Sequence, residues 1–129
     1  MRIFILIGIV LIFSFGCVTS KSHNKVVKGS YEIINQEPYI TENDSAIIIG
    51  SVFDVRTKKP LPYVNIQILN IKKGCSADSL GKFYFNIPSG IYEVEVLSVG
   101  NTEIKTKSIE FLSNTKTEIL FNLGTVIEY

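Results

Sequence analysis

Stretches in which every second residue is apolar fill the middle of the chain, between residues 47 and 100. The alternation is clearest at residues 64–68, 83–87 and 92–96. A period of two places such side chains on one face of a β-strand. Glycine, proline and aspartate separate the stretches, and these residues are typical of turns. Short strands with turn signals at this regular spacing predict an all-β sandwich or barrel.

The phase of the alternation indicates which side chains form the core. Val64, Ile66, Phe83 and Phe85 fall on the apolar side of their strands. Tyr92 also falls there, and we expect its hydroxyl to bond to the backbone, as in the tyrosine corner of other sandwiches. Three aromatic residues fall on the opposite side, namely Phe53, Tyr63 and Tyr84. They either stack on a sugar or a partner or are covered by a neighbouring part of the chain.

The N-terminal residues follow a different pattern. After Arg2, residues 3–13 are almost wholly apolar. This length fits the apolar region of a secretory signal, roughly 7–15 residues, and is short of the roughly 20 residues that cross a bilayer as a helix. Cys17 follows directly after Gly16. A signal, a small residue and then cysteine resembles a bacterial lipoprotein signal, which implies that residues 1–16 are removed and that Cys17 carries lipid.

The alternative is an uncleaved N-terminal anchor in which Cys17 has no role. Residues 17–45 are polar with mixed charge, and we expect them to form a mostly extended tether, with at most a brief strand at residues 31–34. The sandwich is expected over residues 46–123, where residues 103–111 and 116–123 supply two further strands. Residues 124–129 are expected to form a short tail.

A series of turn and core positions within residues 46–123 resembles the carboxypeptidase-regulatory-like domain. The matching positions are Gly50, Val52 and Asp54 (G-x-V-x-D), Pro60 and Pro62 (P-L-P), and then Gly74, Asp78, Gly81, Phe83, Pro88, Gly90 and Tyr92. The resemblance implies a seven-stranded transthyretin-like (prealbumin-like) Greek-key β-sandwich, common in exported proteins of Bacteroidota. Ala77, Leu80 and Asn101 depart from the family pattern, so we expect the turns around Ala77 and Asn101 to be remodelled.

Charge and composition exclude several classes of function. The chain has 13 basic and 12 acidic residues, and Arg2 is the only charged residue of 1–16, so the mature chain is expected to have 12 of each. A neutral chain without a basic cluster is a poor candidate for nucleic acid. The only histidine, His23, lies in the expected tether, and Cys75 has no histidine near it in sequence. A cysteine nucleophile needs an activating base and zinc needs several closely spaced ligands, so we expect no catalytic residue, metal ion or cofactor.

These patterns favour a non-catalytic interaction or structural module of the bacterial cell envelope. We expect it to be held on a membrane through the lipid on Cys17 and to contact an envelope protein. Cys17 is not followed by an acidic run of the kind that resembles a surface-export signal, which favours the periplasmic face of a membrane over the cell exterior. We expect that membrane to be the outer membrane. The alternative is a lipoprotein that binds a glycan or peptide through exposed aromatic residues. A transthyretin-like hydrolase is a distant third, because the histidines and the C-terminal Tyr-Arg-Gly-Ser of that enzyme are missing.

Overall fold

The computed structural model describes residues 24–128, and within them the chain is all β apart from two short 3-10 turns. Side chains are described for residues 27–125. The strands are β1 (Asn24–Val27), β2 (Ser30–Pro38), β3 (Ser45–Asp54), β4 (Asn65–Ile68), β5 (Lys73–Ser76), β6 (Lys82–Pro88), β7 (Gly90–Tyr92), β8 (Val94–Leu97), β9 (Ile104–Lys105), β10 (Ile109–Phe111), β11 (Thr115–Leu123) and β12 (Thr125–Glu128). The 3-10 turns are η1 (Glu42–Asp44) and η2 (Leu69–Ile71).

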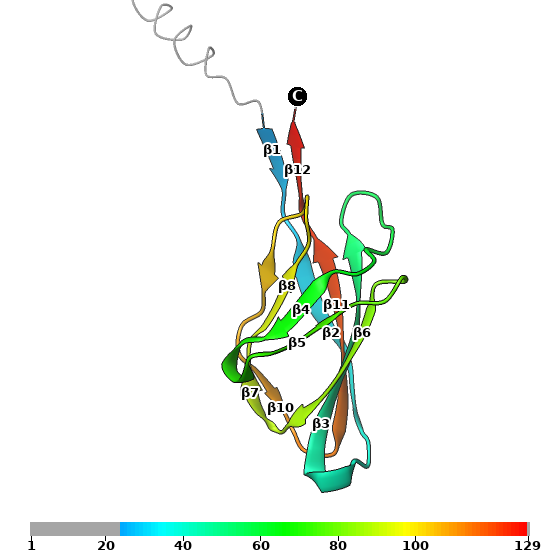
Figure 1. Cartoon of the computed structure of the whole chain (residues 1–129), viewed down its shortest axis with the longest axis vertical. Helices are drawn as coiled ribbons and strands as arrows, with labels where there is room; N and C mark the ends of the chain where they lie inside the picture. The colour runs from blue at the N-terminus through cyan, green and yellow to red at the C-terminus, as the bar shows by residue number, and fades with distance from the viewer. Residues whose placement is uncertain (1–23, 129) are drawn as a thin grey trace, which may run out of the picture.

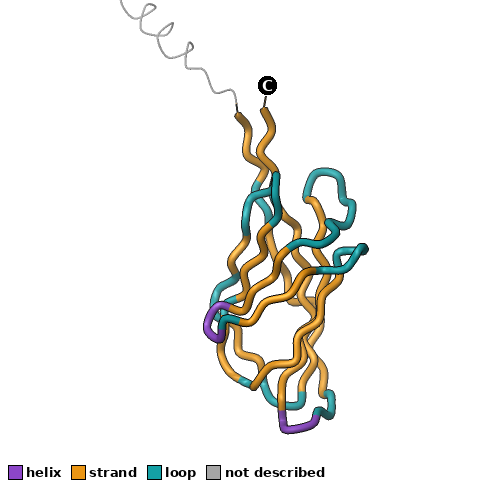
Figure 2. The backbone as a smooth tube through the Cα atoms, in the orientation of Figure 1, coloured by secondary structure: helices purple, strands orange, loops and turns teal. Residues whose placement is uncertain are grey.

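Two four-stranded sheets form the layers of a β-sandwich (Figure 1). One has the order β2-β11-β3-β6 and the other β5-β4-β8-β9. All neighbours are antiparallel except β3 and β11, which run parallel at the centre of the first sheet. A two-stranded pair, β7 with β10, continues below the second sheet in Figure 1. Figure 2 shows a second pair, β1 with β12, projecting beyond the sandwich at the opposite end.

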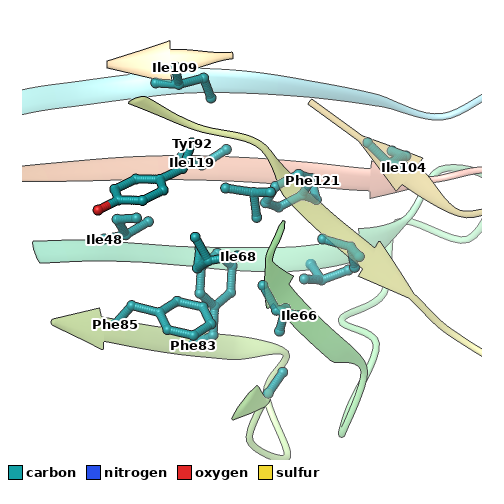
Figure 3. Packing of buried hydrophobic residues seen from close by; sticks show 14 of the residues in the cluster. Ile48, Ile66, Ile68, Phe83, Phe85, Tyr92, Ile104, Ile109, Ile119 and Phe121 are labelled. Carbon is teal, nitrogen blue, oxygen red and sulfur yellow. The ribbon is translucent and has the colours of Figure 1, made fainter. Parts of the chain in front are cut away.

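The core lies between the two sheets, as Figure 3 shows. The five expected core residues are all buried: Val64, Ile66, Phe83, Phe85 and Tyr92. The Phe83 ring lies 6.0 Å from the rings of both Phe85 and Phe121, measured between centroids. Alternation along each strand therefore sets the inward face, as the period of two predicts.

A glycine in β3 makes room for the Phe83 ring. Gly50 lies on the inward face, directly beside the Phe83 ring and the carbonyl oxygen of Ile119. A Cβ at this position would overlap both groups. Glycine in a strand often marks such a close approach, and here the approaching group is an aromatic ring of the core.

Seven strands are predicted, but the described residues contain twelve. Part of the difference comes from interruptions. Glu93 leaves the ladder because its carbonyl oxygen accepts from Leu69 N and its own N–H donates to Asn70 Oδ1, which separates β7 from β8. Thr106 separates β9 from β10, since its hydroxyl accepts from Val94 N at 3.0 Å and donates to the Lys107 carbonyl at 2.8 Å.

The remaining difference comes from the two ends of the described chain. The predicted tether at residues 17–45 contains β1 and the nine-residue strand β2, which pairs with β11 along its length. The predicted tail at 124–129 contains β12, which pairs with β1. The tether prediction is wrong for these residues, because long-range pairing with β11 and β12 stabilises strands that local sequence hardly marks. Residues 1–23, with Cys17 and His23, lie outside the described residues.

Paired glycines mark the junction between the sandwich and the ribbon formed by β1 and β12. A Cβ on Gly29 would lie 2.7 Å from Gly124 N, and a Cβ on Gly124 would lie 2.8 Å from Gly29 N. Asn101 braces the same junction, donating to Gly124 O at 3.1 Å and to Asp54 Oδ2 at 3.0 Å. In the part of the chain that is described, no helix is long and apolar enough to span a membrane.

Candidate interaction surface

One long side of the sandwich is closed, because edge strand β5 contacts edge strand β6. The Lys73 ammonium donates to the carbonyl oxygen of Asn86 at 2.8 Å. The Tyr84 backbone N–H donates to the sulfur of Cys75. Burial raises the pKa of the Cys75 thiol above its usual value, and the Tyr84 hydrogen bond opposes this only in part. Cys75 is therefore a neutral thiol at pH 7 and a poor nucleophile.

The opposite side is closed only over part of its length. Near the ribbon, the backbone N–H of Lys107 donates to the Tyr31 hydroxyl at 3.1 Å. The Tyr31 ring lies 6.2 Å from the Phe121 ring and so belongs to the edge of the core. Toward the far end, β2 forms the edge of one sheet and β10 the edge of the β7–β10 pair. Among the described strands, none pairs with the outer edge of either one.

A groove of about 490 Å³ lies between these two free edges. Its lining combines apolar side chains of β2, β10 and the following loop with a few polar groups. The lining residues are Ile33, Gln36, Glu37, Pro38, Ile109, Glu110, Leu112 and Thr115. Leu112 is 57% exposed and Ile33 is 39% exposed, so part of the apolar lining is open to solvent. The size falls within the range of roughly 300–1,000 Å³ that is usual for ligand sites.

A β-bulge in β2 shapes this lining. Ile33 pairs with Ile119 and Asn35 pairs with Glu118, so Ile34 is an extra residue in β2. A bulge reverses the alternation that follows it. Ile33 before the bulge and Gln36 after it therefore face the same side, although their spacing in a regular strand would place them on opposite faces.

Hydrogen bonds hold the far end of the groove in place. Gln36 Nε2 lies 3.4 Å from the hydroxyl of the buried Thr117. Beyond β2, the Asn114 side chain accepts from Thr41 N at 3.1 Å and from the Thr41 hydroxyl at 2.8 Å. Asn114 Nδ2 also donates to Asp44 Oδ1 at 2.8 Å. Thr41 and Asp44, in the turn that leaves β2, are thus fixed to Asn114 directly before β11, which holds this turn in place beside the groove.

Acidic groups predominate in the groove. Two of its lining residues are carboxylates, Glu37 and Glu110, and none is basic. Glu37 Oε1 lies 3.2 Å from the ammonium of Lys116, which also lies 5.0 Å from the centre of the Tyr39 ring. Glu110 forms no ion pair within the described part of the chain.

The residues that carry the family resemblance have structural roles in the core and in the turns. Val52, Gly50 and Phe83 lie in the core region, and Pro60 forms an isolated bridge with Phe53. The Tyr92 hydroxyl donates to Pro88 O at 2.9 Å, with Gly90 directly beside the phenol ring.

Asp78 and Gly81 shape one turn. Asp78 Oδ1 accepts from Leu80 N at 2.8 Å and from Lys82 N at 2.9 Å. These two hydrogen bonds hold the pKa of the Asp78 carboxyl below its usual value of 3.8. Gly81 has a φ of +75°, and a Cβ there would lie 2.6 Å from Val52 O. Both residues are thus explained by the turn itself.

Asp54 joins three segments at the end of the sandwich that carries the ribbon. Its Oδ1 accepts from Arg56 N at 2.8 Å and Thr57 N at 3.0 Å, while Oδ2 accepts from Asn101 and Thr125. Burial by itself raises the pKa of this carboxyl, but the four hydrogen bonds outweigh it and hold the pKa below 3.8. The departure from the family pattern at Asn101 is therefore part of the contact between Asp54 and the ribbon.

The aromatic alternative receives less support than the groove. Tyr63 is 69% exposed and Tyr84 is 58% exposed, while Phe53 is half-buried. Tyr84 borders a surface hollow that is also lined by Cys75, Ser76, Asp78, Lys82 and Phe83. Within residues 24–128, no group of histidine, cysteine and carboxylate side chains could hold a metal ion.

Sequence patterns missed the groove residues. Ile33 and Ile34 look equivalent in the sequence, and only the register with β11 shows that one is bulged. Leu112 reads as a loop residue, and its position opposite β2 depends on contacts between residues about 75 positions apart, as in the pairing of Pro38 with Thr115. The one available signal was the expected brief strand at residues 31–34.

A comparison with protein families places this sandwich. Residues 48–126 match the model of the CarboxypepD_reg-like domain. The match takes in most of β3 and every strand from β4 to β11, and it begins after β1 and β2. No curated protein matches the chain. Because the match covers more than half of the chain and every strand of the two four-stranded sheets except β2 and the first residues of β3, the chain belongs to the CarboxypepD_reg-like domain family.

Proposed function

We propose that this protein is a non-catalytic interaction module of the bacterial cell envelope, anchored to the outer membrane by lipid on Cys17 and facing the periplasm. The groove beside the free edge of β2 is the observation that carries the interaction role. Free strand edges and apolar grooves are surfaces that bind other chains. The family is one of regulatory, non-catalytic domains, which agrees with this role.

The arrangement of the fold fits an anchor at the N-terminal end. The ribbon of β1 and β12 projects from one end of the sandwich, and β10 lies toward the other end (Figure 1). The groove is lined by residues of β10 and of the second half of β2, so it lies away from the ribbon. Six residues, 18–23, separate Cys17 from β1. Fully extended, they span at most about 20 Å. The ribbon then acts as a short stalk, and the groove points away from the membrane.

The two cysteines provide a matched test of the anchor. We expect a clickable fatty acid to label the protein in cells, and the label to disappear in Cys17→Ser. We also expect that variant to move from the membrane fraction to the soluble periplasmic fraction. Cys75→Ser is the control and should keep both label and membrane association. Mass spectrometry of the purified protein should find Cys17 as the acylated first residue; a protein that retains Met1 would overturn the anchor.

A further inference from the structure

We infer that the groove binds an extended peptide segment of a partner protein, one that alternates apolar and basic residues and adds as a strand to the free edge of β2. This inference rests on the proposed function and specifies the chemistry of the partner. Three properties of the groove carry it: free backbone edges, an apolar lining and an acidic rim.

The backbone step comes from the sheet order. The outer edge of β2 and the outer edge of β10 flank the groove, and no described strand pairs with either. An incoming strand can therefore use the unpaired N–H groups of residues 33–37 and the unpaired C=O groups of residues 33–38 in β2. Main-chain hydrogen bonds supply affinity in this mode of recognition, and pockets for alternate side chains supply specificity.

The apolar step comes from the bulge and from β10. Ile33 on one wall and Ile109 and Leu112 on the other face the same groove. In an added strand every second side chain points into the groove. Those side chains should be apolar, because the lining offers only Gln36 and Thr115 as uncharged polar side chains.

The charge step selects the remaining residues of the peptide. Glu37 and Glu110 line the groove, and Glu32 is exposed on the same strand edge. Of these three carboxylates, Glu37 alone has a cationic partner among the described side chains, namely Lys116. Basic residues in the peptide would therefore meet carboxylates on both walls, whereas acidic residues would be repelled.

The same charges argue against a second copy of this chain as the occupant. Edge-to-edge pairing of two β2 strands would bring Glu32 and Glu37 of one copy beside Glu32 and Glu37 of the other. Like charges across paired strands are destabilising. Charged residues and bulges on an edge are also devices that discourage self-pairing.

The test uses the full-length protein in detergent micelles and three labelled heptapeptides. The first alternates valine with lysine, the second alternates valine with glutamate, and the third is the valine–lysine peptide with N-methylated valines. We expect the first to bind, and the second and third to bind at least about tenfold more weakly, since the second lacks charge complementarity and the third has lost the backbone N–H donors of its valines. Hydrogen exchange should show new protection in residues 33–38 with the first peptide alone.

Two leucines of equal exposure provide a matched pair of variants. Leu112, which lines the groove, is 57% exposed, and Leu80, which does not, is 58% exposed. Leu112→Ser should weaken binding of the valine–lysine peptide by about tenfold, and Leu80→Ser should leave it unchanged. Glu110→Lys should weaken it similarly, whereas Glu103→Lys, an equal charge change at another exposed site, should not.

The inference is overturned if the valine–lysine peptide fails to bind, or if it binds Leu112→Ser and Glu110→Lys as tightly as the unchanged protein. Equal binding of the valine–glutamate peptide would overturn the acidic selection. Self-association that is lost in Leu112→Ser would replace the peptide by a second copy. Labelling at Cys17 is measured separately, so failure of peptide binding leaves the membrane anchor standing, and loss of the anchor leaves the peptide result standing.

Discussion

Phe83 packs against two aromatic rings and lies over a glycine, so a single substitution there tests the inward face of β6. We expect Phe83→Ala to lower the free energy of unfolding by about 3–5 kcal/mol, because it leaves a cavity beside Phe85 and Phe121. Tyr84→Ala is the control and should change it by less than about 0.5 kcal/mol, since its side chain is largely exposed. Urea unfolding of both variants measures the difference. A larger loss for Tyr84→Ala would show that the strand is out of phase.

Asp54 provides a pH-dependent contribution to stability. Its folded-state pKa lies below 3.8, because four hydrogen bonds to the carboxylate outweigh the effect of burial. A lowered folded-state pKa means that the stabilisation is present above the unfolded pKa and is lost as pH falls through the folded pKa. Asp54→Asn should therefore have a lower free energy of unfolding than the unchanged protein at pH 7. This gap in free energy should shrink below pH 3.8.

Denaturant unfolding at a series of pH values measures this gap directly. Glu103→Gln, which removes an exposed carboxylate elsewhere, is the control and should show no gap at either end of the series. A constant gap for Asp54→Asn across the whole range would mean that the shape of the side chain matters and its charge does not.

At the scale of elements, the ribbon of β1 and β12 depends on the close approach of Gly29 and Gly124. A side chain on Gly124 would lie 2.5 Å from Thr102 Oγ1 and would overlap Val27 O. Backbone cannot yield as a flexible side chain can, so we expect Gly124→Val to detach the ribbon. Backbone amides of β1 and β12 should then exchange rapidly, while those of β3 and β6 stay protected.

Ser30→Val is the matched control for the ribbon, because Ser30 is exposed and starts the neighbouring strand β2. It should leave exchange in β1 and β12 unchanged. If Gly124→Val kept both strands protected, the junction would have to tolerate the added side chain and the ribbon would not depend on this contact.

At the scale of the whole molecule, the local sequence pattern was sufficient to predict the central strands of the sandwich. It was not sufficient to predict the edge strand β2. Residues 83–87 alternate cleanly, so burial follows directly from period and phase. The sequence of β2 has no such alternation: in β2 the bulge at Ile34 interrupts the period, and pairing with β11, about 80 positions away, sets the register. The groove could not be predicted from local sequence for the same reason, since its two sides, β2 and β10, come together only in the folded chain.

Strand β2 also lies outside the region that matches the family model, although eight of its nine residues pair with β11. Without β2, β11 would become the edge of its sheet. Phe121 would lose the Tyr31 ring, and if the turn after β2 were also removed, Asn114 would lose both of its hydrogen bonds from Thr41. The match to the family therefore marks less than the structural unit that folds.

We expect deletion of residues 24–44 to lower the melting temperature by roughly 10 °C or more, because several kcal/mol of packing is lost and each kcal/mol shifts a domain of this size by about 4–8 °C. The exposed edge of β11 should also make the variant aggregate, since long unpaired strands recruit other chains. A chain that ends after Thr125 is the control: it removes most of β12 but keeps the hydrogen bond from Thr125 to Asp54, and it should melt within a few degrees of the unchanged protein. Scanning calorimetry and light scattering measure both effects. If the variant without residues 24–44 stayed monomeric and melted like the unchanged protein, β2 would not be needed for the stability of the sandwich. In that case β2 would be too weakly held to form a rigid side of the groove.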